Sequence, residues 1–206
     1  MVDYSQYGQQ QVLLDYWGDR KGYLVDVGAC DGLYLSNSRA LLEMGWEGML
    51  VEPHPETFKK LVENSKGLSV TPVECACGDV SGRMTLNIAP ITLAGLGEVS
   101  SLLPLGNLKD YFRSWSGYND NWTEVVVPVK RVGELCPRKI DLLLVDAEGY
   151  DLHVLKGVDW AVNAPEMVVA EISVVDSKAM DEYMQTVGYK VFHTGNIDLF
   201  FVKKGG

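Results

Sequence analysis

The sequence contains no run of 18 or more apolar residues, so no segment is expected to cross a membrane. It is also poor in basic residues: 18 Lys and Arg stand against 28 Asp and Glu, which gives a formal net charge of −10. Tight binding to a nucleic-acid backbone usually needs a basic face, so we expect no DNA or RNA partner. The first ten residues lack the basic and apolar regions of a signal peptide, and we therefore expect a cytoplasmic protein.

Cysteine is scarce as well, and the positions of the four cysteines disfavour a metal or disulfide framework. Cys30, Cys75, Cys77 and Cys136 show no zinc-knuckle spacing, and Cys75 and Cys77 are too close in sequence to form an easy disulfide. We expect all four to be small buried thiols in a reducing compartment.

The sequence does contain apolar runs that alternate with helical segments. Its 206 residues, 47% of them hydrophobic, suit one α/β domain over residues 1–206 with a helical segment in residues 1–20. Buried strands are expected at 23–28, 48–53, 68–76, 140–149 and 165–172, helices at 8–17, 33–44, 55–65, 150–158 and 176–187, and a hairpin at 189–204. This alternation predicts a mostly parallel sheet with helices on both faces, to which the hairpin adds an antiparallel strand.

Residues 89–124 interrupt this pattern, between extended segments expected at 82–89 and 124–132. The segment is rich in Gly, Ser and Asn and carries scattered aromatic residues, namely Tyr111, Phe112, Trp115, Tyr118 and Trp122. A segment of this length without strong periodicity is typical of a substrate loop or lid. Its aromatic side chains would either stack on an acceptor or pack as a small satellite core.

The turn after the first expected strand, within YLVDVGACDGLYLSNS at 23–38, has the features of a ligand site. Parallel sheets bind ligands outside the carboxyl ends of their strands, where Gly28 and Gly32 would let a ligand approach the backbone and the next helix would present its amides. A dinucleotide site needs G-x-G-x-x-G, and the second and third glycines are missing. Asp26 and Asp31 would repel a pyrophosphate but attract an ammonium group such as that of S-adenosylmethionine.

Glu52 supports an adenosyl ligand at this turn. It stands at the end of the second expected strand, 20 residues after Gly32. An acid at this place can accept hydrogen bonds from both hydroxyls of a ribose. The structural alternative is a solvated residue at a strand end.

Four segments carry a family resemblance. They are DVGACDGLYLSNSRALLEMGWEGMLVEPHPETFKKL, IDLLLVDAEGYDLHVLKG, VSSLLP and YSQYGQQQVLL. The first two resemble the two signatures of the FkbM-type S-adenosylmethionine-dependent methyltransferases, and the others are similar to that family's serine–serine–leucine element and its start. The sequence departs from the family at Gln10, where members often have Asp, and at Asp151, which replaces the usual Glu.

The resemblance implies a class I, Rossmann-like methyltransferase fold with a seven-stranded, mostly parallel sheet. It implies S-adenosylmethionine as the cofactor and methyl transfer to a hydroxyl on a sugar, a glycan or another small metabolite. The residues expected to bind the donor are Asp26, Gly28, Ala29, Asp31, Gly32, Asn37, Glu52, Pro53, His54, Cys75, Ala76, Ser101 and Asp146, with Cys77 as a further candidate.

Methyl transfer to a hydroxyl also needs a group that takes up the hydroxyl proton. Asp146 and Glu148 follow the fourth buried strand and Glu171 ends the next one, so we expect these acids to meet at one sheet edge as catalytic residues, with His153 as a further candidate. Asp146 could instead cap a helix, and Glu148 could interact with the helix N-terminus. The three acids could also hold a divalent metal, but no ligand spacing is diagnostic, and we favour a site without metal.

Other interpretations stay open at this point. A nicotinamide-dependent Rossmann oxidoreductase is one, although the missing glycine counts against it; a non-catalytic S-adenosylmethionine-binding domain is another. N-methylation is a third, because nothing in the sequence names the acceptor atom. Ser100 could bind a ligand or form a turn, and His193 is expected to be structural or exposed at the rim.

Overall fold

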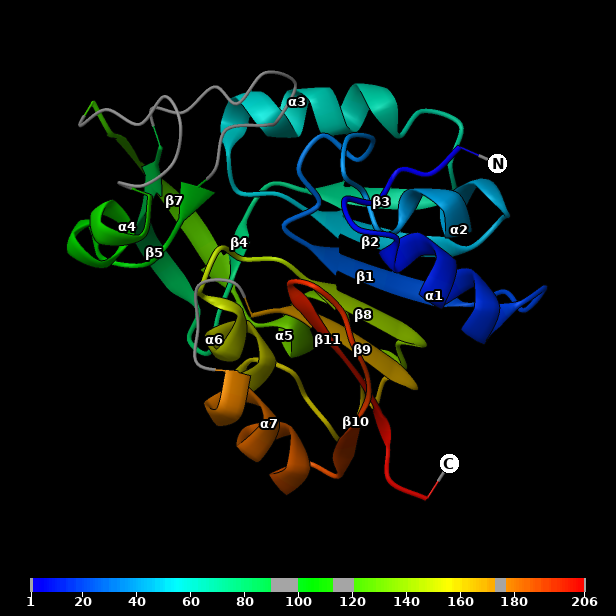
Figure 1. Cartoon of the computed structure of the whole chain (residues 1–206). Helices are drawn as coiled ribbons and strands as arrows, with labels where there is room; N and C mark the ends of the chain where they lie inside the picture. The colour runs from blue at the N-terminus through cyan, green and yellow to red at the C-terminus, as the bar shows by residue number, and fades with distance from the viewer. Residues whose placement is uncertain (1, 90–99, 113–120, 173–176, 206) are drawn as a thin grey trace.

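A seven-stranded sheet forms the centre of the computed structural model, which describes residues 2–89, 100–112, 121–172 and 177–205 (Figure 1). Its strands are β1 (Tyr23–Val27), β2 (Glu47–Val51), β3 (Val70–Val73), β8 (Leu142–Val145), β9 (Met167–Glu171), β10 (Tyr189–Thr194) and β11 (Asp198–Lys203), in the order β10-β11-β9-β8-β1-β2-β3. Neighbouring strands are parallel, except that β11 runs antiparallel to both β10 and β9. The predicted mostly parallel sheet with a closing hairpin is confirmed.

Helices cover both faces of this sheet. On one face lie α1 (Gln9–Trp17), α2 (Arg39–Glu43) and α3 (Pro55–Asn64), and on the other lie α5 (Val132–Leu135), α6 (Asp151–Lys156) and α7 (Ser177–Thr186). In β1, Leu24 packs with the first group and Val25 with the second. Because β1, β8 and β9 are buried on both faces, they consist of nearly continuous apolar runs, and the sequence pattern identifies them easily.

The winding of the chain reverses between β1 and β8. Strands β2 and β3 extend the sheet on one side of β1, whereas β8 and β9 extend it on the other. Val27, Val51 and Val145 are aligned in register, so the residues that follow β1, β2 and β8 leave the sheet at the same edge. An open α/β sheet binds its ligands at such a reversal.

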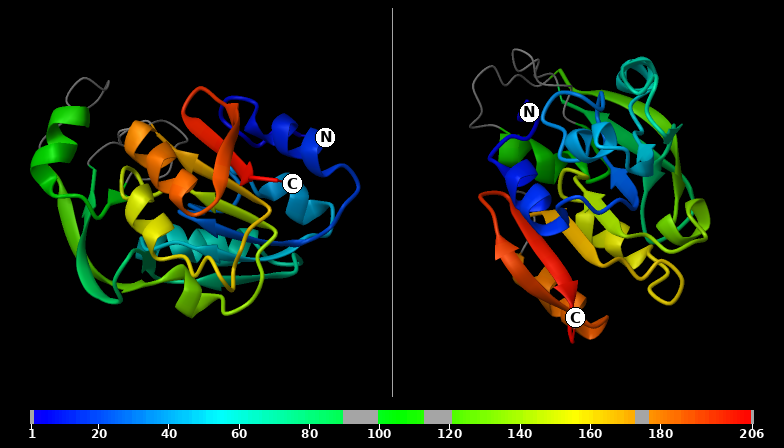
Figure 2. Two further views of the ribbon diagram at one scale, coloured as in Figure 1. Left: turned by 90° about the horizontal axis from the view of Figure 1, so that it is seen from below. Right: turned by 90° about the vertical axis from the view of Figure 1, so that its right-hand side faces the viewer.

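A second, four-stranded sheet contains much of the chain between β3 and β8 (Figure 2). It consists of β4 (Ala76–Cys77), β5 (Gly82–Ile88), β6 (Ser100–Ser101) and β7 (Thr123–Lys130), in the order β4-β7-β5-β6, and α4 (Leu105–Phe112) follows β6. The strand expected at 68–76 is confirmed as β3, but its predicted end is wrong, because β3 ends at Val73 and Ala76 pairs in the other sheet. Within the predicted loop at 89–124, α4 was not expected, and Trp115 and Tyr118 lie outside the described residues.

The helix expected to begin at Leu33 begins only at Arg39. The carboxylate of Asp31 accepts hydrogen bonds from the backbone N–H groups of Leu33 and Tyr34, at 2.9 and 2.8 Å, and Leu35 has a left-handed φ of 53°. A carboxylate that binds nearby backbone groups competes with helix formation. The amides beside the first turn therefore belong to a loop, and not to the helix N-terminus that the sequence pattern indicated.

The other predicted helices are confirmed with small shifts at their ends, and α1 occupies the segment expected to be helical within residues 1–20. The short helix α5 was not expected. Within the four described ranges, no helix combines the length and the apolar character that a membrane crossing needs.

Candidate functional site

A cavity of about 310 Å³ opens at the reversal point of the main sheet. It is bounded by the carboxyl ends of β1, β2, β8 and β9, by the start of β11, and by parts of α1 and of the second sheet. Six acids line it: Asp26, Glu52, Asp146, Glu148, Glu171 and Asp198. No lysine, arginine or histidine is among the described residues of the lining, so the cavity is strongly suited to positively charged groups.

Gly28 forms the floor of the cavity after β1 and fits against the neighbouring turn. Its φ is +84°, and its N–H donates to the carbonyl oxygen of Val51 at 2.9 Å. A Cβ at this position would lie 1.7 Å from the carbonyl oxygen of Asp146. The glycine is therefore required both by the backbone conformation and by the close approach of two chain segments. Ala29, which follows it, also lines the cavity.

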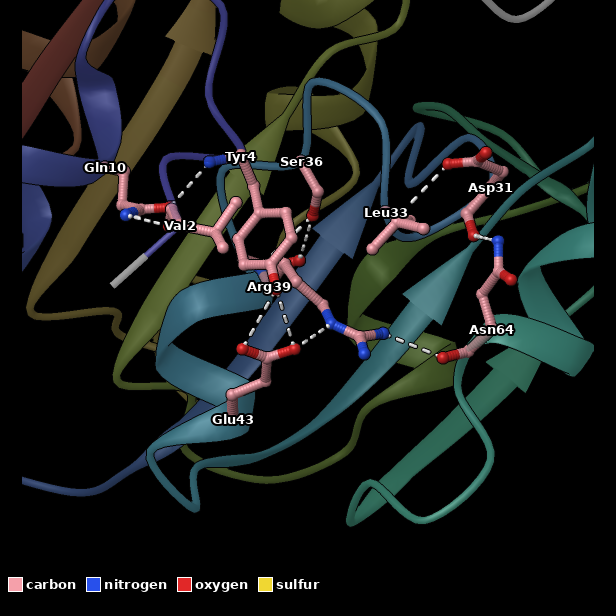
Figure 3. Close-up of polar contacts among 10 residues, drawn as sticks. Val2, Tyr4, Gln10, Asp31, Leu33, Ser36, Arg39, Glu43 and Asn64 are labelled. Carbon is pink, nitrogen blue, oxygen red and sulfur yellow. Dashed lines mark hydrogen bonds and ion pairs between the residues drawn. The ribbon is translucent and has the colours of Figure 1, made fainter.

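Asp31 and Gly32 lie outside the cavity lining, although the sequence places them in the same turn. The Asp31 side chain closes the loop by accepting from backbone N–H groups, and its own carbonyl oxygen accepts from Asn64 Nδ2 at 2.9 Å (Figure 3). A Cβ on Gly32 would lie 2.6 Å from Leu61 Cδ1 of α3. Both residues thus shape and pack the turn, and a direct contact with a ligand has no support in their positions.

Asp26 and Asn37 lie at the cavity wall on the α2 side. Asp26 accepts a hydrogen bond of 2.6 Å from Ser38 Oγ, and Ser36 Oγ lies 3.2 Å from Ser38 Oγ. Burial raises the pKa of Asp26 to about 6, against a smaller lowering by the Ser38 hydrogen bond. The Asn37 Oδ1 atom is enclosed and has no hydrogen-bond partner among the described residues. A ligand amino group would satisfy this acceptor.

Glu52 is buried at the end of β2 and holds the first turn. Its Oε2 accepts from the Cys30 N–H at 3.0 Å, and its Oε1 accepts from the His54 N–H at 2.8 Å. Burial raises the pKa of Glu52 to about 8, and the charges of Asp146 and Asp26 add to this. Each oxygen keeps a second lone pair, which a ribose hydroxyl can use.

The residues flanking Glu52 and those after β3 divide into two groups. Pro53 lines the cavity, as do Cys75, Ala76 and Cys77. His54 is buried outside the lining, where its Nδ1 accepts from the Thr57 N–H at 3.1 Å and caps α3. A direct contact of His54 with the donor therefore has no support in its position.

The turn after β8 resembles the first turn in its construction. Glu148 and Gly149 have positive φ values of 49° and 91°. The side chain of Asp151 accepts from the Ala147 N–H at 3.2 Å and from the Gly149 N–H at 3.0 Å. Ser101 Oγ, from the second sheet, donates to the Glu148 carbonyl oxygen at 2.8 Å. The turn that carries Asp146 is thus fixed from two sides.

Asp146, Glu148 and Glu171 meet at the cavity, as the sequence predicted. Asp146 faces the open space of the cavity but is surrounded by protein. The resulting desolvation, followed by the charges of Asp198 and Asp26, raises the pKa of Asp146 to about 7. A hydrogen bond with the Glu171 side chain lowers this pKa by a smaller amount. Burial and then Asp146 raise the pKa of Glu148 well above its usual range. Asp146 and Glu148 can therefore hold protons near neutral pH, which suits acid–base chemistry.

His153 lies outside this cluster. Its Nδ1 is 3.2 Å from Asp79 Oδ2, and its ring stacks on Tyr150, with 4.3 Å between centroids. Tyr150 lines the cavity whereas His153 does not, and His193 packs against Phe200. Among the described residues, no group of three or more His, Cys, Asp or Glu side chains is arranged to hold a metal ion.

Several lining residues were not found by sequence reasoning. Among them are Gln6, Tyr7 and Gln9 before and in α1, Tyr34 in the loop, Tyr150 before α6, and Asp198 at the start of β11. A signal for Asp198 was present: β11 was expected to run antiparallel, so its first residue had to lie at the edge where β9 ends. The N-terminal residues gave no such signal, because nothing in the sequence tells which sheet edge α1 approaches.

S-adenosylmethionine fits the residues that are present. Its sulfonium and ammonium groups match an acidic cavity, and its amino group matches the enclosed Asn37 Oδ1. Its ribose matches the remaining acceptor capacity of Glu52, which lies opposite Gly28 on the neighbouring strand ends.

Comparisons with known proteins agree with this chemistry. The family model described as the methyltransferase FkbM domain matches residues 26–191. The hexuronic acid methyltransferase AglP of Haloferax volcanii is 32% identical over 123 residues, which are 59% of this chain and 45% of that protein. The crystal structure of the methyltransferase FkbM from Methylobacillus flagellatus KT superposes with a TM-score of 0.61 at 14% identity, over 96% of this chain and 48% of that one.

The three matches differ in how much of each protein they cover and in sequence identity. The chain spans about half the length of both proteins, and at 14% identity the crystal structure shows the likeness of the fold. The family model covers most of the chain, including both turns, Glu52 and the acids after β8 and β9. The chain therefore belongs to the FkbM family of methyltransferases, whose methyl donor is S-adenosylmethionine.

Proposed function

We propose that this protein transfers a methyl group from S-adenosylmethionine to a hydroxyl on a sugar or another small metabolite. One observation carries the proposal: a single cavity joins a turn suited to the donor, at Gly28 and Glu52, with a cluster of protonatable acids at Asp146 and Glu171. The relative AglP, by its name, acts on a hexuronic acid, which favours a sugar acceptor here.

The donor would be held by groups from three strand ends. The backbone at Gly28 and Ala29 lets it approach the sheet, and Glu52 accepts from the ribose hydroxyls. Asp26 and Asn37 face its amino group, while Cys75 and Ala76 lie where an adenine would pack. When bound, S-adenosylmethionine supplies a methyl carbon that is activated by the adjoining sulfonium.

Asp146 is the group best placed to take up the acceptor proton. Its pKa of about 7 leaves a substantial ionised fraction at neutral pH and makes it a stronger base than an ordinary aspartate. The Asp146 carboxylate would take up the proton of the acceptor hydroxyl as the methyl group is transferred to that oxygen, and the electron pair of the broken bond would stay on the donor's sulfur. Alignment of the acceptor in the cavity supplies a further part of the rate enhancement.

Ligand binding is the first test of this function. At a concentration 100 times the dissociation constant, a ligand adds about 2.7 kcal/mol to the free energy of unfolding. We expect S-adenosylmethionine and S-adenosylhomocysteine to raise the melting temperature and NAD to leave it unchanged. A response to NAD alone would favour the oxidoreductase.

Methyl transfer is the second test. We expect transfer of labelled methyl from S-adenosylmethionine to hexosides and hexuronides, with the product carrying an O-methyl group by mass spectrometry and NMR. The Asp146→Asn variant should keep its affinity for S-adenosylhomocysteine and lose about 100-fold or more in turnover, because it lacks the base. Donor binding without any transfer across acceptor classes would point to a non-catalytic binding domain, and transfer to nitrogen would overturn the O-methyl assignment.

A further inference from the structure

We propose, on the basis of the function above, that Gln9 and Asp198 are positioning residues. The Gln9 amide holds Asp198 in place with its negative charge beside the Asp146–Glu171 pair, and this charge strengthens the pair as a base. Neither residue needs to touch the substrate for this role.

The first step is the contact between the two ends of the chain. Helix α1 lies beside β11 (Figures 1 and 2), and Gln9 Nε2 donates to Asp198 Oδ2 at 2.6 Å. Both side chains are almost fully buried, with exposed fractions of 4% and 3%. The Tyr7 N–H donates to Gln9 Oε1 at 2.8 Å, so the amide is fixed with its NH₂ group toward the carboxylate.

The second step is the position of Asp198 in the sheet. Its Cα is paired with that of Glu171 across β11 and β9, and the Glu171 side chain is hydrogen-bonded to Asp146. All three carboxyls line the same cavity. After burial itself, the charge of Asp198 is the largest cause that raises the pKa of Asp146.

The other titratable groups that face Asp146, among the residues that the structure describes, are all acids. They are Asp26 from β1, Glu52 from β2, Glu148 from the turn, Glu171 from β9 and Asp151 from α6. A lysine or arginine on Asp198 would orient it but would also neutralise it. Burial raises the pKa of Asp198, and the neutral amide of Gln9 opposes this by favouring the ionised form without cancelling its charge.

The experiment is a carboxyl titration of the ligand-free protein, followed by ¹³C NMR with labelled Asp and Glu and assigned with Asp146→Asn. In Asp198→Asn, which keeps the side-chain shape, we expect the Asp146–Glu171 pair to titrate about one pH unit lower than in the wild type. Gln9→Met, which keeps length but loses the amide, should shift the titration in the same direction by less, because Asp198 then binds its own proton more readily.

Gln10→Met is the matched control. Gln10 is as buried as Gln9, with 5% exposed, and its side chain binds the Tyr4 N–H and the Val2 carbonyl oxygen of the N-terminal segment, not the acid cluster (Figure 3). We expect it to leave the titration of the pair unchanged. Circular dichroism checks that each variant is folded.

The outcomes separate this proposal from the proposed function. An unchanged titration in Asp198→Asn, or an equal shift in Gln10→Met, overturns the positioning role whatever the enzyme methylates. A shifted titration in a protein that transfers no methyl group would leave the contact network intact and overturn the function instead. In an active enzyme, the acid limb of the turnover–pH profile should move to lower pH in Asp198→Asn while the affinity for S-adenosylhomocysteine stays unchanged.

Discussion

The turns after β1 and β8 are built alike, but they lie in different surroundings. Each contains residues with positive φ, and in each an aspartate accepts two backbone N–H groups: Asp31 from Leu33 and Tyr34, and Asp151 from Ala147 and Gly149. Asp31 is partly exposed to solvent, whereas Asp151 is completely buried.

This difference shows how one local device can serve two purposes. At the first turn the carboxylate stays in contact with water and shapes a loop around the donor site. At the second turn the carboxyl is desolvated, and burial followed by the charge of Asp146 raises its pKa to about 8. The second turn therefore adds Asp151 to the acids that hold protons at neutral pH.

The largest expected effect comes from Gly28→Ala, because Gly28 is where the two turns touch. The added Cβ would meet the Asp146 carbonyl oxygen, and we expect a loss of more than about 3 kcal/mol in the free energy of unfolding, measured with urea. Gly67→Ala is the matched control, since Gly67 has a similar φ of +85° and open space around it, and should lose only about 1 kcal/mol. Equal losses would show that the two turns are not in tight contact.

Glu52→Ala should have the next largest effect, on donor binding. It removes both ribose acceptors and the support of the Cys30 N–H, so we expect the affinity for S-adenosylhomocysteine to fall about 100-fold, or ~2.7 kcal/mol, by calorimetry. Glu52→Gln, which keeps the shape, should give a smaller loss. Glu56→Ala, at an exposed site on α3, should give none. Unchanged affinity in Glu52→Ala would remove Glu52 from the donor site.

A third prediction concerns pH and the buried second turn. The pKa of Asp151 is about 8 in the folded protein and about 3.9 in an unfolded chain, so the unfolded state ionises first and the wild type loses stability as pH rises between these values. Asp151→Asn cannot ionise. Its free energy of unfolding should therefore improve relative to the wild type between about pH 5 and about pH 8.5.

The loss in free energy of unfolding at low pH should differ between the corresponding substitutions in the two turns. At about pH 5, Asp151→Asn should cost about 1–3 kcal/mol, because its NH₂ group faces a backbone N–H that is then left unsatisfied in the interior. Asp31→Asn should cost less, because Leu33 and Tyr34 both donate to Asp31 Oδ1, so one amide oxygen can keep both bonds at a site that is partly exposed to water. Two results would contradict the role of burial. One is an equal loss of stability in Asp151→Asn and Asp31→Asn. The other is a free energy of unfolding of Asp151→Asn that falls, relative to the wild type, as pH rises.

The smallest expected effect is that of Ser101→Ala, which removes one side-chain hydrogen bond to the second turn. Loss of the bond to the Glu148 carbonyl oxygen should cost about 1 kcal/mol, seen as a roughly fivefold lower turnover with unchanged affinity for S-adenosylhomocysteine. Ser65→Ala, which loses a bond to the Val62 carbonyl oxygen at 3.2 Å but lies outside the cavity lining, is the control and should keep normal turnover. A loss of donor affinity in Ser101→Ala would instead place Ser101 in the donor site, as the sequence suggested.

Sequence reasoning was most successful for residues at the carboxyl ends of buried strands, because the strand itself fixes their position. Glu52, Asp146 and Glu171 follow or end buried apolar runs, and parallel strands bring such positions to one edge. It was less successful inside the turns. Asp31 and Gly32 were grouped with the ligand-binding residues because they are adjacent to them in sequence, yet they bind the loop backbone and pack against α3.

The sequence by itself determined the alternation of strands and helices and the meeting of Glu52, Asp146, Glu148 and Glu171 at the carboxyl edge, because these depend on local periodicity and on the rules of parallel sheets. The tertiary structure alone decided that Gln9 reaches Asp198, that Ser101 ties the second turn, and which carboxyls are desolvated. Those contacts join residues from distant parts of the chain, and a carboxyl's pKa depends on everything packed around it rather than on its neighbours in sequence.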